Sequence, residues 1–505
     1  MELEASVVRH KTAIRRYSLS RPANLLLQNS ILKQNETIFD YGCGHGHDID
    51  ILTNMGFAIT GYDPYYRPSA ELISSDVVNL LYVLNVIENP VERTEVLTKA
   101  FNLAKKAICV SVMTPLQQRY EGDSFSDGVI TKRNTFQKYY TQDELKEYLE
   151  TTLRRSAIAL EPGIFVVFRE ESDRLEFLEN KLSRRRFVLT IPGLDRPEHL
   201  ATPRVTILDK VRSYARLREI LDFISRHGRP PISGENSAFD QLASELGTNS
   251  RIEQAILSQL DQAALSEVVS SRKADLEVIY ATRRFDKLGY PKQTDIPLQT
   301  LADIKAFYGS YKAFLESANQ LLFSLGSDDV VQKAFSKCKI GKNLPDAVYI
   351  HPSAIPSLPS HIRVLLGLAD SIAGTIPECN LIKLNKIKRK ISFMVYEDFD
   401  SVAHPALLYT YVIDVPKANI KLWDFRNREN PPILHRKETF VSPDYPLYEK
   451  FKKLTAQEEK AELLSLNTIG TKEGWETLLK QKGLTITGHS LKKLEAKSAE
   501  LPAET

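Results

Sequence analysis

Two acids and three glycines near the start of the chain have types and spacing that could bind a nucleotide-like ligand. An apolar run that begins at Thr37 leads through Asp40 into a glycine-rich turn, and a second apolar run, 57–62, is followed by Asp63. The glycines of the turn are Gly42, Gly44 and Gly46. Without a Cβ they let the backbone approach a ligand closely, and the second acid can accept hydrogen bonds from a ribose diol. The pattern predicts such a ligand over the carboxyl ends of parallel strands.

The spacing of the glycines indicates which class of ligand the turn binds. It is Gly-x-Gly-x-Gly and not the Gly-x-Gly-x-x-Gly of a dinucleotide site, and it resembles the cradle of class I S-adenosylmethionine-dependent methyltransferases. The resemblance implies S-adenosylmethionine as the cofactor, with Gly42, Gly44 and Gly46 along its methionine end, Asp40 near its amino group and Asp63 on its ribose. The alternatives are an ordinary strand-to-helix turn of another Rossmann-like protein and, for Asp63, a helix-capping acid.

Alternating apolar runs and helical patterns predict the elements that must position these residues. The predicted strands are 37–41, 57–62, 76–84 and 106–113, followed by a closing hairpin of 157–160 and 164–169. The predicted helices are 48–55, 91–103 and 142–151, the last opened by a capping box at Thr141 and Glu144. Strands that alternate with helices indicate an α/β fold with a mostly parallel, doubly wound, Rossmann-like sheet over about residues 30–170.

The connection that follows Asp63 is too short for a complete methyltransferase sheet. From Asp63 to Asp76 is only thirteen residues, whereas a helical crossover takes a dozen or more before its strand is counted. We therefore expect 64–75 to form a loop or one short strand, so that the usual third strand and its preceding helix are missing. The acid that commonly meets the adenine amino group then has no clear counterpart.

No catalytic residue follows from the sequence. DNA amino-methyltransferases carry (Asp/Asn/Ser)-Pro-Pro-aromatic after the fourth strand, and cytosine C5 enzymes carry Pro-Cys. The corresponding stretch here, 82–89, has neither motif, and the near-match Asn430-Pro-Pro-Ile433 lies far outside the sheet, where a loop is the simpler interpretation. Asn79 and Asn85 are placed to touch cofactor or substrate, and we count Asn79 among the cofactor-binding residues.

Length and composition describe an ordinary globular protein. Because a domain typically has ~150 residues, a chain of 505 residues is expected to form roughly three domains. The predicted division is a methyltransferase-like domain at 1–170, a helical domain at 171–344, a mixed α/β domain at 345–445 and a helical C-terminal tail at 446–505. Within it, 206–227 and 251–285 have the pattern of long helices, and 483–505 that of a frayed, charged end.

Four dispersed cysteines, no signal pattern and no long apolar run favour a soluble protein of the cytoplasm, without a membrane partner. The net charge is only +3, so any nucleic-acid contact must be local. Basic clusters occur at 9–16, around Arg184, Arg185 and Arg186, and at 383–390. Each could be a solvated face, but adjacent aromatics favour phosphate contact, with DNA, or RNA, as the partner.

Histidines and acids offer few metal-binding patterns. His45 and His47 have no third ligand nearby, so a role at a helix start is the simpler interpretation, and no metal is predicted. A second group in the C-terminal half could form another site, although surface or satisfied core positions are the default. Its members are His351, Glu397, Asp398, Asp400, His404, His435 and Glu438.

Several passages together resemble the family of DNA phosphorothioation-associated methyltransferases. They are 9–14, 39–44, 61–68, 76–79, 85–88, 135–139, 351–353 and 430–438. The resemblance extends over most of the chain and implies a bacterial protein linked to a DNA sulfur-modification, restriction or defence system, with partners among its proteins. The family more often has Arg and Asp where this chain has His45 and His47, so those two side chains receive no role from it.

Two functions of different classes follow. The first is a methyltransferase that modifies DNA or RNA, and the intact glycines and Asp63 favour it. The second is a non-catalytic nucleic-acid-binding or adaptor protein that keeps the fold, which the short 64–75 connection and the missing acceptor motif favour. A small-molecule methyltransferase is a third idea, which the long region outside the sheet disfavours.

Overall fold

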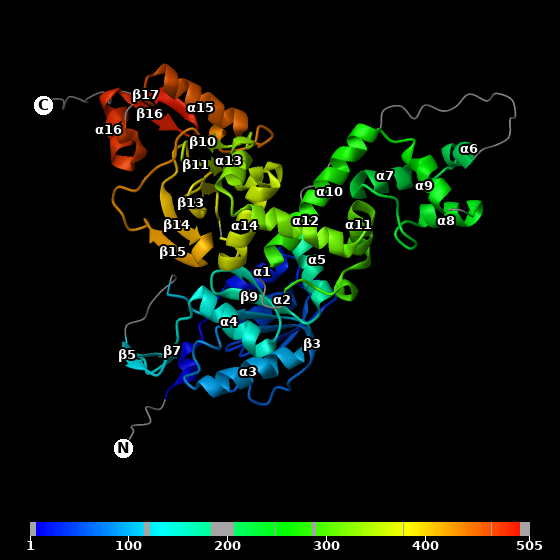
Figure 1. Ribbon diagram of the computed structural model, residues 1–505. Coiled ribbons are helices and arrows are strands. Elements are labelled where there is room, and N and C mark those ends of the chain that lie inside the picture. Colours follow the sequence, from blue (N-terminus) through cyan, green and yellow to red (C-terminus); the bar gives the residue numbers. More distant parts are fainter. Residues whose placement is uncertain are drawn as a thin grey trace, which may run out of the picture.

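A computed structural model describes residues 7–115, 122–182, 207–247, 249–284, 289–376, 378–465 and 467–494. The first part of the chain forms a six-stranded sheet in the order β2-β1-β3-β4-β9-β8, near the bottom of Figure 1. Its strands are β1 (Thr37–Tyr41), β2 (Ala58–Tyr62), β3 (Ser75–Leu81), β4 (Ala104–Ser111), β8 (Ala157–Glu161) and β9 (Ile164–Phe168). The first four are parallel, and β9 and β8 close the sheet as an antiparallel hairpin. The predicted α/β sheet is confirmed.

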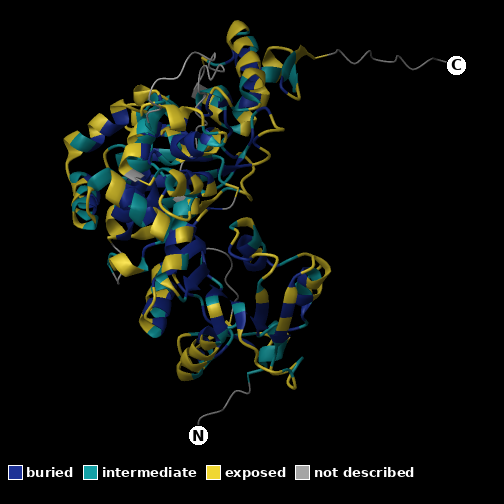
Figure 2. Ribbon diagram, turned by 90° about the vertical axis from the view of Figure 1, so that its right-hand side faces the viewer, coloured by how far each residue is buried: buried dark blue, intermediate teal, exposed yellow. Residues whose placement is uncertain are grey.

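Helices cover both faces of this sheet, so its central strands are buried (Figure 2). One core cluster joins the sheet to α3 (Pro90–Leu103) and α4 (Gln142–Leu153), and the other joins it to α1 (Arg21–Gln28), α2 (His47–Asn54) and α5 (Glu171–Leu182). The predicted capping box forms, with Thr141 accepting from the Glu144 N–H. A small sheet lies beside this domain, made of β5 (Gly122–Phe125), β6 (Gly128–Thr131) and β7 (Phe136–Gln137).

The expected gap in the sheet is present. Residues 64–74 form turns and a loop, with a single bridge between Asp63 and Arg67. Strand β2 is consequently the sheet edge, and no further strand of the described residues lies beside it. The prediction for 64–75 is confirmed, with Ser75 already the first residue of β3.

The middle of the chain is helical. Its helices are α6 (Ile207–Arg212), α7 (Leu217–His227), α8 (Ser237–Leu246), α9 (Asn249–Leu257), α10 (Gln262–Arg283), α11 (Leu298–Tyr308), α12 (Tyr311–Ser324) and α13 (Asp328–Ser336). The prediction of unbroken helices over 206–227 and 251–285 is wrong. The second breaks before Asp261, whose side chain accepts from the first N–H groups of α10 and so starts a new helix.

A second six-stranded sheet, antiparallel throughout, follows these helices. Its strands are β10 (Lys342–Asn343), β11 (Ala347–Ile350), β12 (Leu381–Asn385), β13 (Lys390–Tyr396), β14 (Leu407–Asp414) and β15 (Asn419–Asp424), and α14 (Ser360–Ala373) packs on it. One core cluster contains residues of α10, α12, α13, α14 and this sheet. These elements therefore pack as one unit, while the predicted domain division stays a prediction.

The C-terminal end differs from its prediction. Helices α15 (Tyr448–Lys460) and α16 (Lys472–Gln481) are followed by a hairpin of β16 (Leu484–Thr487) and β17 (Ser490–Lys493). The expectation of a frayed or helical end is wrong over 484–493, because alternating Leu484, Ile486 and Leu491 pack against the cluster around Trp475. Within the described residues, no helix has both the length and the apolar character that a membrane crossing requires.

Candidate functional site

The glycine turn lies where the carboxyl ends of β1 and β2 meet. Gly42, Gly44 and Gly46 have φ values of 83°, 53° and 83°, in the left-handed region that favours glycine. A Cβ at Gly42 would lie 2.5 Å from Cγ2 of Val83, and one at Gly46 would lie 2.3 Å from Nη2 of Arg67. The backbone conformation favours glycine at all three positions. Crowding adds to this at Gly42, whereas the flexible end of Arg67 could move away from a Cβ at Gly46. Gly46 ends the turn as the N-cap of α2.

Asp63 connects the two loops that follow these strands. Its Oδ2 accepts a hydrogen bond from the Gly44 N–H at 3.0 Å, and its Oδ1 accepts from the N–H groups of Tyr65 and Tyr66, each at 2.9 Å. The capping role that the sequence left open is thus present, in a turn rather than a helix. A carboxylate offers about four acceptor sites, so one remains for a ligand hydroxyl.

Asp40 provides a buried acid beneath the turn. It is 4% exposed, and its strand partners in register are Gly61 on β2 and Asn79 on β3. Burial, followed by the negative charge of Asp48, raises the pKa of Asp40 to about 7. This carboxyl group can therefore change its protonation near neutral pH when a cation approaches.

A cavity of about 1800 Å³ opens over these strand ends. Its walls come from the segments around Arg9, Gly44, Asp63, Tyr82 and Arg133. The cavity therefore joins the predicted cofactor residues to the N-terminal segment and to the turn after β6, neither of which the glycine pattern indicated.

An ion-pair cluster holds the N-terminal segment against the cavity. The Arg9 guanidinium donates to Glu88 at 2.9 and 2.8 Å and to Glu92 at 2.5 and 2.7 Å. Nearby, the Val8 N–H donates to the Asn134 carbonyl at 2.9 Å. Both carboxylates belong to the region around the start of α3, so Arg9 fastens the N-terminal segment to this part of the cavity wall.

Aromatic side chains line the same wall. The rings of His10 and Tyr65 are stacked with centroids 3.9 Å apart and an interplanar angle of 5°, and the Tyr66 hydroxyl donates to the His10 carbonyl at 3.1 Å. The His45 ring lies 4.3 Å from that of Tyr66. This aromatic group was not predicted from the sequence, where its only signal is the Tyr65-Tyr66 pair directly after Asp63-Pro64.

The two asparagines differ in position. Asn85 lies on the cavity wall, and its buried Oδ1 has no hydrogen-bond partner among the described residues. Asn79 is fully buried on β3, and its side-chain amide is likewise without a partner in the described part of the chain. It is not among the residues that line the cavity, so its predicted contact with a cofactor stays a prediction.

The described members of the basic clusters do not all face one site. Residues 9–14 and Arg16 border the cavity, but Lys181 pairs with Asp370 at 2.7 Å and Arg389 pairs with Asp328 at 2.6 Å. Lys390 pairs with Asp414 at 2.9 Å. The predicted phosphate contacts Arg184, Arg185 and Arg186 lie outside the described residues.

Comparison with known proteins supports the fold and its class. Residues 12–152 match the family model described as "Methyltransferase domain", which covers the glycine turn, Asp63 and most of the cavity wall. The match confirms that this part of the chain has the predicted methyltransferase fold, while the domain bounds 1–170 stay a prediction. No match to a curated protein was found.

Solved methyltransferase structures are similar to part of the chain. The 1,6-didemethyltoxoflavin-N1-methyltransferase of Burkholderia thailandensis, bound to S-adenosylhomocysteine, is 15% identical over 29% of this chain and 76% of its own, with a TM-score of 0.24. A SAM-dependent methyltransferase from Aquifex aeolicus is 16% identical over 33% of this chain and 98% of its own, with a TM-score of 0.23. One from Methanosarcina mazei is 16% identical over 28% and 94%, with a TM-score of 0.22.

Replacing Arg9 should release the N-terminal segment. We expect Arg9→Ala to increase amide hydrogen exchange over residues 8–13, because Glu88 and Glu92 lose their shared cation. Exchange in β1 and β3 should stay unchanged. Lys11→Ala, an exposed cation of the same segment, is the control. Equal protection of residues 8–13 in wild type and Arg9→Ala would contradict the assignment of Arg9 as the fastening.

Proposed function

We propose that this protein transfers a methyl group from S-adenosylmethionine to nucleic acid, with DNA as the favoured acceptor. The observation that carries the proposal is the joint position of the glycine turn and Asp63 at one large cavity, inside the region that matches a methyltransferase domain. Class I ligands bind outside the carboxyl ends of parallel strands, which is where β1 and β2 end.

The residues around the cavity fit the cofactor. The three glycines leave the space that a Cβ would fill, so the methionine part can lie against bare backbone. The Asp40 carboxyl group can face its cationic end, and the remaining acceptor site of Asp63 can take a ribose hydroxyl. The aromatic wall of His10, Tyr65 and Tyr66 offers a stacking surface where the missing third strand would have supplied an acid.

The chemistry that the cofactor supplies is a methyl group activated on a sulfonium sulfur. When bound, the cofactor would give this methyl group to an acceptor atom held in line with it and would leave as S-adenosylhomocysteine. Any proton on the acceptor leaves to water or a base. The chain contributes in-line positioning and a fixed electrostatic environment. Asn85 lines the cavity, and its buried Oδ1 has no partner among the described residues, so a small turn of its side chain would let it accept an N–H or O–H of the acceptor.

A nucleobase is the acceptor that the cavity favours. A volume of about 1800 Å³ exceeds the range of about 300–1000 Å³ for ordinary small-molecule sites, so room remains beside the cofactor. Lys11, Arg16 and Arg133 lie at its edge and can contact phosphates, while the aromatic wall can stack a base that has left its helix.

The link to a DNA sulfur-modification system is supported in part by residues outside the methyltransferase domain. Segments 351–353 and 430–438 carry part of the family resemblance, yet they belong to the second sheet and its surroundings. We therefore extend the proposal to a protein that works with the other components of such a system.

A non-catalytic adaptor is the second candidate. The third strand that the sheet lacks among the described residues, and the acceptor motif that the sequence lacks between β3 and α3, favour it. The two candidates differ in one measurable property, because only the enzyme must bind S-adenosylmethionine.

Asp63→Ala should weaken cofactor binding by about 1.5–3 kcal/mol, the value of a hydrogen bond to a charged group. Isothermal titration calorimetry of the full chain would measure it. Asp50→Ala, an exposed acid on α2, is the matched control and should bind as the wild type does. A wild-type protein that binds no cofactor at millimolar concentration would refute the enzyme and favour the adaptor.

Cofactor binding should release a proton near neutral pH. The pKa of Asp40 is raised to about 7, so part of the population is protonated without ligand, and a cation beside it stabilises the carboxylate. Affinity should rise between about pH 6 and pH 8. Titrations in two buffers of different ionisation enthalpy would detect the proton, and Asp40→Asn should abolish the buffer dependence. Proton uptake on binding would contradict this role for Asp40.

Replacing Arg184, Arg185 and Arg186 together with Ala should lower DNA affinity about equally for unrelated sequences. Phosphate contacts release counterions, so the dependence of binding on salt should also become less steep. The charge-matched control replaces Lys452, Lys453 and Lys460, which are exposed on α15. Fluorescence anisotropy over a salt series would measure both effects. An unchanged salt slope would assign the three arginines to a solvated surface.

A further inference from the structure

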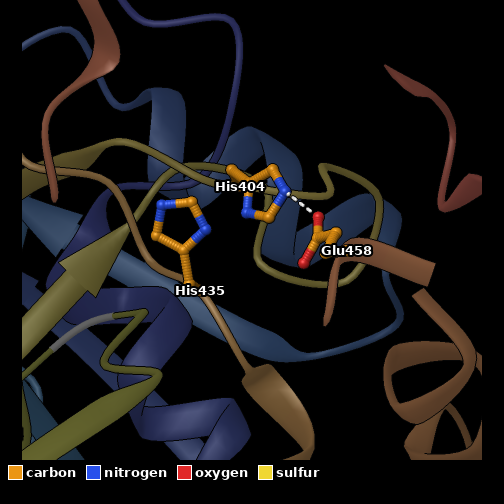
Figure 3. Close-up of side chains that lie close together, drawn as sticks. All are labelled: His404, His435 and Glu458. Atoms are coloured by element: carbon orange, nitrogen blue, oxygen red, sulfur yellow. Dashed lines mark hydrogen bonds and ion pairs between the residues drawn. The ribbon is translucent and has the colours of Figure 1, made fainter. Parts of the chain in front are cut away.

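Far from the glycine turn, two histidines and a glutamate converge in the C-terminal part of the chain (Figure 3). His404 precedes β14, His435 follows β15, and Glu458 lies on α15. Each offers one ligand atom, and these atoms all lie within 4.8 Å of one another. The methyltransferase proposal uses none of the three, so a role for this cluster does not depend on it.

Backbone carbonyls fix how both imidazoles are protonated. His404 Nδ1 lies 3.1 Å from the Leu434 carbonyl oxygen, and His435 Nε2 lies 2.7 Å from that of Ile469. A carbonyl oxygen only accepts hydrogen bonds, so these two ring nitrogens carry the protons. In the neutral rings, His404 Nε2 and His435 Nδ1 are then lone-pair donors. A ligating histidine in a metal site commonly donates its other ring N–H to a carbonyl in this way.

Some polar atoms of the cluster find no hydrogen-bond partner within it. His404 Nε2 lies 2.6 Å from Oε1 of Glu458, a contact between two acceptors unless a cation or proton lies there. Glu458 is fully buried, and neither its Oε2 nor the buried His435 Nδ1 has a hydrogen-bond partner in the part of the chain that the structure describes. A single proton satisfies the first contact and leaves the other two atoms unpaired, at the cost that a buried acceptor carries.

The neighbouring basic side chains do not donate hydrogen bonds to these unpaired atoms. Lys437 donates to the carbonyls of Phe399 and Val402 at 2.6 and 2.7 Å, and Arg436 pairs with Glu459. Trp475 closes the cluster, with its ring centroid 4.7 Å from that of each histidine.

We propose that His404, His435 and Glu458 bind a divalent transition-metal ion, and that zinc is the ion they suit best. Two imidazoles and one carboxylate are ligands that zinc takes in proteins, with a water molecule able to complete a tetrahedron. Zinc–ligand bonds of about 2.0–2.2 Å place the ligand atoms of a tetrahedron about 3.4 Å apart. The 2.6 Å contact of His404 Nε2 with Glu458 Oε1 would therefore open slightly, while wider separations, up to 4.8 Å, would close. The ion would also give a partner to the cluster's acceptor atoms that a single proton leaves without a hydrogen bond.

The position of the cluster assigns the ion a structural role. Its ligands come from the loop before β14, the segment after β15 and α15, while Ile469 and Trp475 come from the next stretch of chain. The ion therefore fastens α15 to the segments before β14 and after β15, and the contacts of His435 with Ile469 and Trp475 connect the next stretch of chain to it.

Metal analysis of the full-length protein tests the proposal. The protein would be stripped with chelator, equilibrated with zinc, freed of unbound ion and analysed by mass spectrometry for zinc per chain. We expect about one zinc ion per wild-type chain and a large loss in Glu458→Gln and in His435→Ala. His361→Ala, a histidine outside the cluster, should retain the ion. Zinc should also raise the thermal unfolding midpoint of wild type and leave that of Glu458→Gln unchanged.

X-ray absorption at the zinc edge keeps the test decisive if the variants fail to fold. Wild-type protein should show nitrogen and oxygen ligands with the signature of two imidazoles. Absence of retained zinc, sulfur ligands from the free cysteines, or folded variants that retain zinc as wild type does would each overturn the proposal. The short contact between His404 and Glu458 would then be a proton-sharing ion pair.

Discussion

The carboxylate of Asp63 holds the candidate site together. It accepts hydrogen bonds from Gly44 in the loop after β1 and from Tyr65 and Tyr66 in the loop after β2. The same bonds place Tyr65 under the ring of His10. One side chain thus couples the glycine turn, the aromatic wall and the N-terminal segment. A carboxylate can do this and still accept from a ligand, because it offers about four acceptor sites.

The missing third strand explains why the wall is built in this way. With β2 at the sheet edge, the side of the cavity next to it lacks, among the described residues, the strand and helix that would normally close it. Residues 64–74 turn back on Asp63, and residues 7–16 lie across them, fastened by Arg9 to Glu88 and Glu92. Stacking and ion pairs therefore replace strand pairing. Such contacts open more easily than a sheet, which would suit the large acceptor that we propose.

Local sequence patterns predict the sheet. Features that depend on contacts between distant residues could not be predicted from such patterns. The strands, the glycine turn and the gap after Asp63 follow from apolar runs, backbone requirements and chain length, all readable within about 15 residues. The stack of His10 on Tyr65 and the pairing of His404 with Glu458 join residues that are 55 and 54 positions apart. No periodicity in the sequence predicts such contacts. The hairpin of β16 and β17 escapes prediction for another reason: its apolar residues are few, and only packing on Trp475 gives them a structure.

The contact between the two sheets determines how their sites can cooperate. The Thr375 N–H donates to the Leu160 carbonyl at 2.7 Å, and Gln142 reaches the Ala373 carbonyl at 3.3 Å. Gly374 has a φ of 75° and a ψ of −176°, a region essentially limited to glycine, and a Cβ there would lie 2.6 Å from the Glu161 nitrogen. The backbone at the end of α14 therefore packs directly against the backbone of β8. Because α14 also belongs to the core of the second sheet, that sheet is held in a defined orientation to the methyltransferase domain. A partner bound by the C-terminal part would consequently meet the cavity at a fixed position, and the modification system that we propose would need such an arrangement.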